Sequence, residues 1–467
     1  MDLPLTLGYV GRPRLKMPTL RLVNAFAETS AEGPEQYVRT RRPGISLLNT
    51  VGTGPILAQY QQLGAFNGST FSVSGNAFYK DSALVATVAY SSAPRMAAAN
   101  GQLALVSGGG LYIYTNGALT PQLTFNDGVS LLPPFTGVYV LYNIFIYPVV
   151  GSDMFFFSTV GNPGSISAAN FSAAQTAPDS IVEIGVLNEE FYIFGQTSIE
   201  IWDFNGSINA PFALSPGRTY ARGCAGQNTV AKLDNALFWI GDDNVVYRSG
   251  AVPKKVSTPL IDDRILAEGA VGVSTARCFK VETEGHVFYV MNLYTIGETW
   301  AYDCQTEQWA QWGTLTGASS APSVFRCSTC VGQGQNIQLG DYLNGNVYLL
   351  DQTNPTDNGY NIPVTVSGFH AMDGGRQRNT NVSLHCIRGN ATATTPAPIV
   401  QMRYSDDGAQ TWTSWIPGYI GMAGDHNYKA SWRSLGIMQQ PGRYFEFRIS
   451  DPVITAIQGA TMNEARI

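Results

Sequence analysis

The sequence predicts an all-β protein: an extended N-terminal arm, a β-propeller of six or seven blades, and a small C-terminal β-sandwich. Composition and a repeated strand pattern carry this prediction. Only 13% of the 467 residues are charged, 11% are aromatic and 49 are glycine, whereas an average soluble domain has about 25% charged residues and about 7% glycine. This composition excludes a disordered chain and a coiled coil, and it favours strands joined by tight turns.

The propeller is predicted by seven similar segments, each with two apolar, aromatic stretches around a Gly, Asn or Asp turn. Their first residues are Phe66, Asn100, Val138, Ile181, Asn228, Ala276 and Ala321, so successive starts lie 34 to 48 residues apart. Propeller blades of four strands repeat at about this spacing. A row of sandwich domains is the alternative, but no linker rich in Pro, Ser or charge interrupts residues 66–351. We therefore assign residues 51–358 to the propeller.

The two ends of the chain differ from this repeated body. Residues 1–50 are predicted to form the extended arm, with a strand at 20–23 and an end at the Arg-Arg-Pro-Gly sequence 41–44. The stretch 351–363 is rich in Asn, Asp, Gly and Pro and indicates a boundary. Beyond it, residues 359–467 alternate apolar and polar positions, which predicts a small sandwich.

Charge is unevenly distributed over these regions. The formal charge is +3 for residues 1–45, −11 for residues 46–369 and +2 for residues 370–467. An acidic centre argues against tight nucleic-acid binding, which needs clustered Lys and Arg. The one dense basic cluster holds Arg39, Arg41 and Arg42. We take these three arginines as a candidate contact with an acidic partner ring, with a solvated loop as the alternative.

One long uncharged and apolar run, residues 128–152, is long enough for a membrane span. Three prolines, Pro133, Pro134 and Pro148, interrupt it, and its other residues are largely β-branched or aromatic. This pattern predicts a pair of buried or interface strands and no stable membrane span. The first residues also lack the continuous apolar core of a signal peptide.

Cysteine and histidine provide no metal-binding pattern. The six cysteines are scattered, and the single Cys-Ser-Thr-Cys sequence at Cys327 and Cys330 lacks a second pair of ligands at zinc-site spacing. We therefore predict two free thiols there, and the role of this pair stays open. No cofactor and no metal are expected.

The sharpest short motif is Ser-Asp-Asp-Gly-Ala-Gln-Thr-Trp at residues 405–412. It is similar to the Asp-box of glycan-processing propellers, S-x-D-x-G-x-T-W, with Ala409 in place of the motif's glycine. In such a hairpin tip a carboxylate accepts backbone N–H groups of its own turn, and the tryptophan packs beneath it. The motif occurs once and outside the repeats, so we assign its residues a structural role: Ser405, Asp407, Gly408, Thr411 and Trp412. No catalytic motif is present, and the chain is predicted not to be an enzyme.

Patterns at both ends of the chain carry a family resemblance. The N-terminal pattern runs from Arg21 to Ile45, and the C-terminal one follows the Ser405–Trp412 motif to the end of the chain. The most specific residues of the resemblance, from both patterns, are Val23-Asn24, Pro43-Gly44, Asp406-Asp407-Gly408, Arg433, Gly436 and Phe447-Arg448. Together with the order of arm, propeller and sandwich, they resemble the packaged-DNA stabilisation proteins of short-tailed bacteriophages, also called tail hub or nozzle proteins.

The resemblance implies a virion protein of the tail that is assembled in the host cytoplasm as a homohexameric ring. Such a ring lies below the portal and its adaptor ring, closes the DNA exit channel after packaging and forms part of the conduit for genome ejection. It holds a tail needle or plug and docks tail fibres or spikes, and double-stranded DNA passes through it without tight binding. Two alternatives remain: a receptor-binding propeller for host attachment and, on the Asp-box alone, a glycan-processing enzyme.

Overall fold

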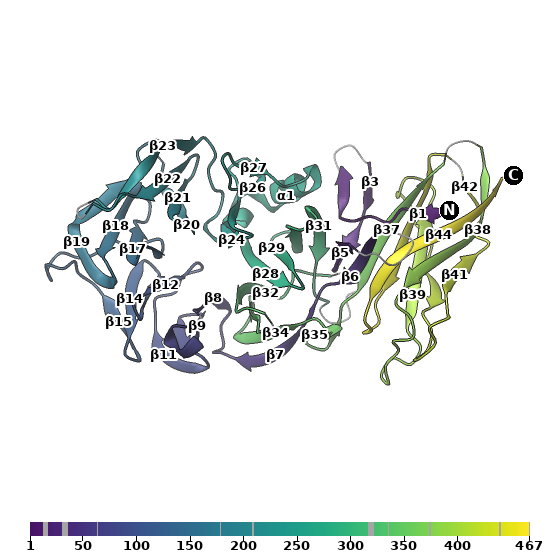
Figure 1. Ribbon diagram of the computed structural model, residues 1–467, viewed down its shortest axis with the longest axis horizontal. Coiled ribbons are helices and arrows are strands. Elements are labelled where there is room, and N and C mark those ends of the chain that lie inside the picture. Colours follow the sequence, from purple (N-terminus) through teal and green to yellow (C-terminus); the bar gives the residue numbers. More distant parts are fainter. Residues whose placement is uncertain are drawn as a thin grey trace.

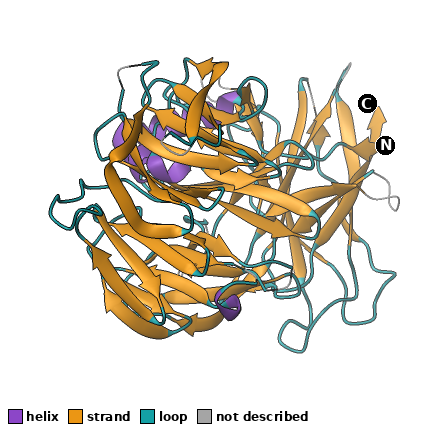
Figure 2. Ribbon diagram, turned by 60° about the vertical axis from the view of Figure 1, so that its left-hand side comes forward, coloured by secondary structure: helices purple, strands orange, loops and turns teal. Residues whose placement is uncertain are grey.

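The computed structural model describes residues 1–12, 17–29, 36–62, 64–177, 179–207, 210–315, 322–334, 336–372, 375–438 and 440–466. The molecule is elongated, with a β-propeller at one end and a two-sheet sandwich at the other, and both chain termini lie at the sandwich end (Figure 1). Strands dominate both parts, and the helical segments are few and short (Figure 2).

Seven blades of four antiparallel strands each form the propeller in the described part of the chain; five of them are separate sheets, and two are parts of larger sheets. The first five blades are blade 1, β8 (Ile56–Gln61), β9 (Thr70–Ser74), β10 (Ala77–Lys80) and β11 (Ala83–Thr87); blade 2, β12 (Arg95–Ala99), β13 (Gln102–Ser107), β14 (Gly110–Thr115) and β15 (Ala118–Gln122); blade 3, β16 (Tyr139–Leu141), β17 (Ile144–Pro148), β18 (Met154–Thr159) and β19 (Asn162–Ala173); blade 4, β20 (Ile181–Leu187), β21 (Glu190–Gly195), β22 (Ile199–Phe204) and β23 (Phe212–Tyr220); and blade 5, β24 (Ala231–Leu233), β25 (Ala236–Ile240), β26 (Val246–Arg248) and β27 (Lys254–Lys255).

The last two blades close the ring. Blade 6 holds β28 (Arg277–Thr283), β29 (His286–Leu293), β30 (Glu298–Asp303) and β31 (Gln308–Trp312), and blade 7 holds β32 (Cys327–Val331), β33 (Gln338–Asp341), β34 (Asn346–Asp351) and β7 (Gly44–Thr50). The first strand of each blade contacts the first strand of the next, and β32 returns to β8. The structure therefore has seven blades, and the outermost strand of the last blade is supplied by the N-terminal region.

The turns explain why the sequence could predict these strands. Asn100-Gly101 joins β12 to β13, Asn116-Gly117 joins β14 to β15, and all four residues have positive φ. Asn and Gly tolerate this left-handed backbone, which matches the twist of a two-residue hairpin. Between blades, aromatic side chains fill the space: Phe155 of blade 3 lies 5.3 Å from the ring centre of Trp202 of blade 4.

A single α-helix interrupts the pattern and was not predicted from the repeats. Helix α1 (Pro259–Thr275) lies between blades 5 and 6, and Pro259 is its first residue, where a missing N–H has no cost. Its side chains Leu260, Ile261 and Ile265 are fully buried against these blades. Two 3-10 turns, η2 (Phe66–Gly68) and η3 (Gln227–Thr229), complete the helical segments of the described residues.

The sandwich is built from both ends of the chain. One sheet has the order β4 (Leu22–Val23), β37 (Val364–Ala371), β43 (Gly442–Ile449), β39 (Ile399–Ser405) and β40 (Ile416–Tyr419); the other has β5 (Ala25–Thr29), β6 (Tyr37–Arg41), β44 (Ala456–Arg466), β38 (Gln377–Cys386) and β41 (Ala430–Arg433), with β1 (Asp2–Leu3) beside β44 and β42 (Ile437–Met438) beside β38. Apolar side chains of both sheets form one core, which includes Leu384, Met402, Phe445 and Phe447.

One sheet runs without interruption from the propeller into the sandwich. Strand β4 pairs with β31 of blade 6 on one side, at Val23 and Gln311, and with β37 of the sandwich on the other, at Val23 and Thr365. Residues 1–50, predicted to form an extended arm, therefore pair with both parts of the molecule. Residues 1–41 contribute strands to the sandwich, and β7 completes blade 7, because unpaired strand edges in both parts gain hydrogen bonds from these segments. Two short strands connect the propeller to the sandwich: β35 (Thr356–Asp357), which pairs with β7, and β36 (Tyr360–Asn361). A separate two-stranded sheet consists of β2 (Val10–Arg12) and β3 (Met17–Leu20).

Candidate functional site: the buried junction of propeller and sandwich

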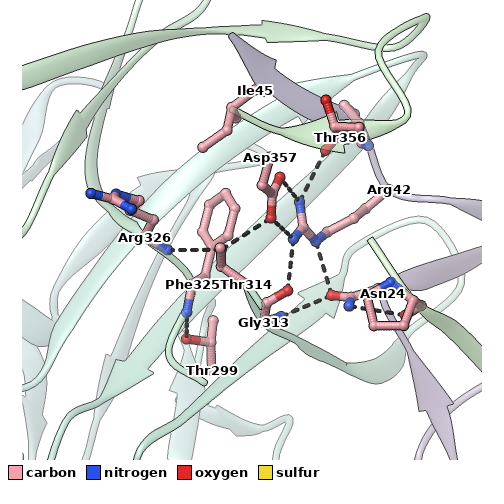
Figure 3. Close-up of polar contacts among 12 residues, drawn as sticks. Asn24, Arg42, Ile45, Thr299, Gly313, Thr314, Phe325, Arg326, Thr356 and Asp357 are labelled. Atoms are coloured by element: carbon pink, nitrogen blue, oxygen red, sulfur yellow. Dashed lines mark hydrogen bonds and ion pairs between the residues drawn. The ribbon is translucent and has the colours of Figure 1, made fainter. Parts of the chain in front are cut away.

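The centre of the junction is Arg42, between β6 of the sandwich and β7 of blade 7 (Figure 3). Its Nη1 and Nη2 donate to the two carboxylate oxygens of Asp357 at 3.0 and 2.5 Å. The remaining donors reach Gly313 O at 2.8 Å, Pro43 O at 3.1 Å and, from Nε, Asn24 Oδ1 at 2.9 Å. Arg42 thus connects three segments that are distant in the sequence, at Asn24, Gly313 and Asp357.

Both charged groups of this ion pair are fully enclosed. The side chains of Arg42 and Asp357 are 0% and 1% exposed. The guanidinium lies over the ring of Phe325, 4.7 Å from its centre, and Asp357 accepts a further hydrogen bond from Thr314 Oγ1 at 3.0 Å. A buried ion pair is tolerated only when its remaining hydrogen-bonding capacity is satisfied. Here the shared partners hold the junction in one arrangement.

The contacts of Asn24 give a structural reason for the Val23-Asn24 pair, which is one of the patterns of the family resemblance. It follows β4 with a positive φ of 53°, a conformation in which Asn is enriched. Its Oδ1 accepts from the Gly313 amide at 2.8 Å as well as from Arg42, and its Nδ2 donates to Pro363 O at 3.1 Å. All polar atoms of this side chain are therefore used to connect the propeller with the sandwich.

Gly44 explains the Pro-Gly pair in the same way. A Cβ at this position would lie 2.3 Å from Thr356 O and 2.4 Å from Asn354 O. The chain that leaves the propeller passes directly against the start of β7, where Asp357 pairs in parallel with Ile45. Only glycine allows this approach of two backbones.

The three arginines of the predicted basic cluster are buried, and this corrects the expectation of an exposed partner-binding or solvated loop. Arg39, Arg41 and Arg42 are 1%, 6% and 1% exposed. Arg39 donates to Thr6 O at 3.1 Å and to Leu5 O at 2.6 Å, and burial together with neighbouring Arg42 lowers the pKa of Arg41 to about 10. The guanidinium groups of Arg39 and Arg42 donate to backbone carbonyls inside the monomer, whereas Nη1 of Arg41 is buried without a hydrogen-bond partner. None of the three side chains presents an exposed surface to a partner ring.

The Asp-box-like residues form the loop between β39 and β40. Asp407 accepts from the amides of Gln410 and Thr411 at 3.0 and 2.9 Å and from the hydroxyls of Thr411 and Ser405 at 2.5 and 2.7 Å. These hydrogen bonds lower the pKa of Asp407 to about 2. Gly408 follows with a φ of 71°. All of these hydrogen bonds to the carboxylate come from its own loop.

The tryptophan of this motif packs differently from the expectation. Trp412 lies against the guanidinium of Arg403, 4.6 Å from ring centre to Cζ, and Trp415 covers the same group at 4.5 Å. Arg403 Nε also donates to Glu446 at 2.7 Å. The neighbouring Asp406 pairs with Arg443, which is 1% exposed. The sequence did not reveal these arginine partners because they lie on other strands.

A second polar network joins consecutive blades of the propeller. Arg95 of blade 2 pairs with Glu183 of blade 4 at 2.8 Å, and Tyr139 of blade 3 donates to the same carboxylate. Arg95 also donates to Gln227 O and Asn228 Oδ1, both at 3.0 Å. The network thus joins the first strands of blades 2, 3 and 4 with the 3-10 turn η3, which precedes blade 5.

The thiols and possible metal ligands add no further site. All six cysteines are free, and Cys327 is fully buried on β32. Burial raises the pKa of Cys330 to about 12. Among the described residues no group of three His, Cys, Asp or Glu side chains could hold a metal ion. Within the same ranges, no helix is both long and apolar enough to span a membrane.

Solved structures that are similar to this chain share little sequence identity with it. The designed protein Ika8 has a TM-score of 0.39 at 11% identity, over 71% of this chain and 99% of that chain. U3-55K has a TM-score of 0.41 at 12% identity, over 66% and 99%. The exo-β-1,3-galactanase of Phanerochaete chrysosporium, solved with galactose, has a TM-score of 0.32 at 9% identity, over 89% and 100%. A search of curated proteins found no match.

The family comparison is more specific than these structures. The model of the family Phage_stabilise, described as Bacteriophage P22 Gp10, beta-propeller, matches residues 1–355. This range contains the strands that the N-terminal region gives to the sandwich and all seven blades. It also contains Asn24, Arg42 and Gly44 of the junction. The chain therefore belongs to the Phage_stabilise family of bacteriophage structural proteins.

Proposed function

We propose that this protein is the tail hub, or nozzle, of a short-tailed bacteriophage and performs no catalysis. In this role a homohexameric ring attaches below the portal-adaptor ring, closes the DNA exit channel after packaging and forms part of the conduit for ejection. The ring also holds a tail needle or plug and docks tail fibres or spikes. Family membership is the observation that carries the proposal.

The small size of the propeller centre bears on how such a conduit could be built. The cavity that the first strands of blades 1, 2, 6 and 7 line there measures only about 230 Å³, and Arg95 lies in its wall. A DNA duplex that passes this protein therefore runs between subunits and not through one propeller. A ring of several copies around a common axis provides that path, which supports an oligomer as the working form.

The charge distribution supports a wall past which DNA slides. No Lys or Arg occurs between Arg95 and Arg218, a stretch that covers blade 3 and most of blades 2 and 4. Phosphate binding depends on clustered basic residues, so this sector has no means of holding DNA tightly. The same sector exposes several large apolar side chains, which suit contacts with neighbouring subunits. They include Leu123, Val129, Leu131, Val150 and Phe171.

The junction supports a load-bearing role. A sheet that continues from blade 6 through β4 into the sandwich gives the subunit a hydrogen-bonded connection along its length. The buried Arg42–Asp357 pair locks the chain exit of the propeller beside that sheet. A gate against packaged DNA needs subunits whose two parts do not move apart under force, and this construction meets that need.

Negative-stain microscopy of the purified chain mixed with its portal and adaptor rings tests the proposal. A six-fold ring stacked on the adaptor is expected. A monomer that ignores the adaptor and binds cell-surface glycan instead would contradict it and favour a receptor-binding propeller. Turnover of a sialoside or polysaccharide panel would favour an enzyme, and none is expected.

A further inference from the structure

A cavity of about 320 Å³ opens at the mouth of the propeller, beside the Arg95 network, with which it shares Asn228. Its lining comes from blades 1, 6 and 7 and the loops between blades. The residues that define its chemistry are Tyr90, Ser92, Arg277, Tyr294, Ser328 and Tyr342. This volume lies at the small end of the range for ligand sites.

Arg277 gives the cavity a positive charge. It is the first residue of β28, and its guanidinium is held in place by Leu57 O, at 2.7 Å from Nη1, and by Ser92 O. No described carboxylate forms an ion pair with it, whereas nearby Arg95 is neutralised by Glu183. Burial and the charge of Arg95 lower the pKa of Arg277. A cation that is fixed by carbonyls alone, next to an open cavity, is complementary to an anion.

Three tyrosines give the cavity flat apolar surfaces with polar edges. The rings of Tyr294 and Tyr342 lie 5.0 Å apart at a tilt of 42°. Tyr90 is 63% exposed at the rim. Burial raises the pKa of Tyr294 to about 12, so its hydroxyl stays protonated. Aromatic faces of this kind pack against the C–H faces of a ring, and their hydroxyl groups serve as hydrogen-bond partners.

We propose that this cavity binds a single acidic sugar unit, a uronic acid or similar residue of a surface polysaccharide. Its carboxylate lies against Arg277, and its ring lies against the tyrosines. A guanidinium pairs with a carboxylate through two parallel N–H groups, and the aromatic faces match the pyranose better than they match a peptide side chain or a phosphate. The inference is independent of ring assembly, so either can fail without the other.

Saturation-transfer NMR with galacturonate, galactose and acetate tests this assignment on the full chain. Galacturonate is expected to bind in the millimolar range, and galactose and acetate each at least about tenfold more weakly. Equal binding of galactose would show that Arg277 does not recognise the carboxylate. Equal binding of acetate would show that the ring is not recognised. Either result would overturn the proposal.

Variants locate the effect at the cavity. Arg277→Gln is expected to weaken galacturonate binding about tenfold, Arg277→Lys to restore part of it, and Tyr90→Ala to weaken it without affecting the fold because this side chain is exposed. Arg388→Gln is the matched control, since Arg388 also donates to a backbone carbonyl, Tyr428 O at 2.8 Å, but lies on the sandwich. The site would be refuted if Tyr90→Ala and Arg277→Lys fold and bind galacturonate as tightly as the wild type does. It would also be refuted if Arg388→Gln weakened galacturonate binding as much as Arg277→Gln.

Discussion

The Arg42–Asp357 pair is predicted to be the most sensitive point of the molecule. Replacing Asp357 with Asn leaves a fully buried guanidinium without its counter-charge and weakens the bonds from Arg42 and Thr314. Breaking a buried ion pair in this way costs about 3–5 kcal/mol of unfolding free energy. With a urea dependence of about 3 kcal/mol/M, the unfolding midpoint should fall by about 1 M or more.

Urea unfolding followed by tryptophan fluorescence measures this effect, because Trp312 lies beside Arg42. The matched control is Asp234→Asn, which removes an ion pair of similar length, 2.8 Å, between Asp234 and Arg248. This pair lies on the surface, where the side chain of Asp234 is 43% exposed and that of Arg248 is 30% exposed. Exposed pairs contribute about 0–1 kcal/mol, so the control should stay near the wild type. If Asp357→Asn and Asp234→Asn shift the midpoint equally, the reasoning about burial is wrong.

Three further predictions concern the junction, the axis and pH. Gly44→Ala should destabilise the protein by about 1–3 kcal/mol in the same assay, because its Cβ would overlap two carbonyl oxygens; an unchanged midpoint would contradict the close approach. Glu183→Gln should cost about 3 kcal/mol by thermal unfolding, since it leaves Arg95 uncompensated between blades; no loss would show that the axial network is dispensable. His286 of blade 6 bonds to Asp303 at 2.9 Å and lies 3.9 Å from Glu28 of the sandwich, and the Asp303 hydrogen bond raises its pKa above 6.5. The protonated His286 therefore stabilises the protein fully below about pH 6.5, and this stabilisation is lost as the pH rises through the pKa of the folded state. Between pH 6 and 8 the wild type should lose more unfolding free energy than His286→Gln does. Identical pH profiles of the two proteins would refute this.

Local sequence features predicted much of the fold because strands and tight turns are encoded by neighbouring residues. The Asn-Gly pairs at 100–101 and 116–117 need only their own backbone conformation to end one strand and start the next. The hairpin at Asp407 is likewise closed by residues within four positions. Helix α1 was missed because it lies in a gap between repeats, although Thr258 and Pro259 are typical of a helix start.

The sequence by itself thus determined that this is a Gly-rich, weakly charged propeller with a C-terminal sandwich. Only the tertiary structure decided how the ends are used. Arg42 and Asp357 are 315 positions apart, and no local pattern distinguishes a buried arginine with a distant carboxylate from one on a solvated loop. The same holds for β4 and β7, whose partners lie at the other end of the chain, and for Arg277, whose missing counter-charge becomes visible only once the blades enclose it. Strand pairing and charge burial between distant segments are properties of the folded chain, so they could be established only from its three-dimensional arrangement.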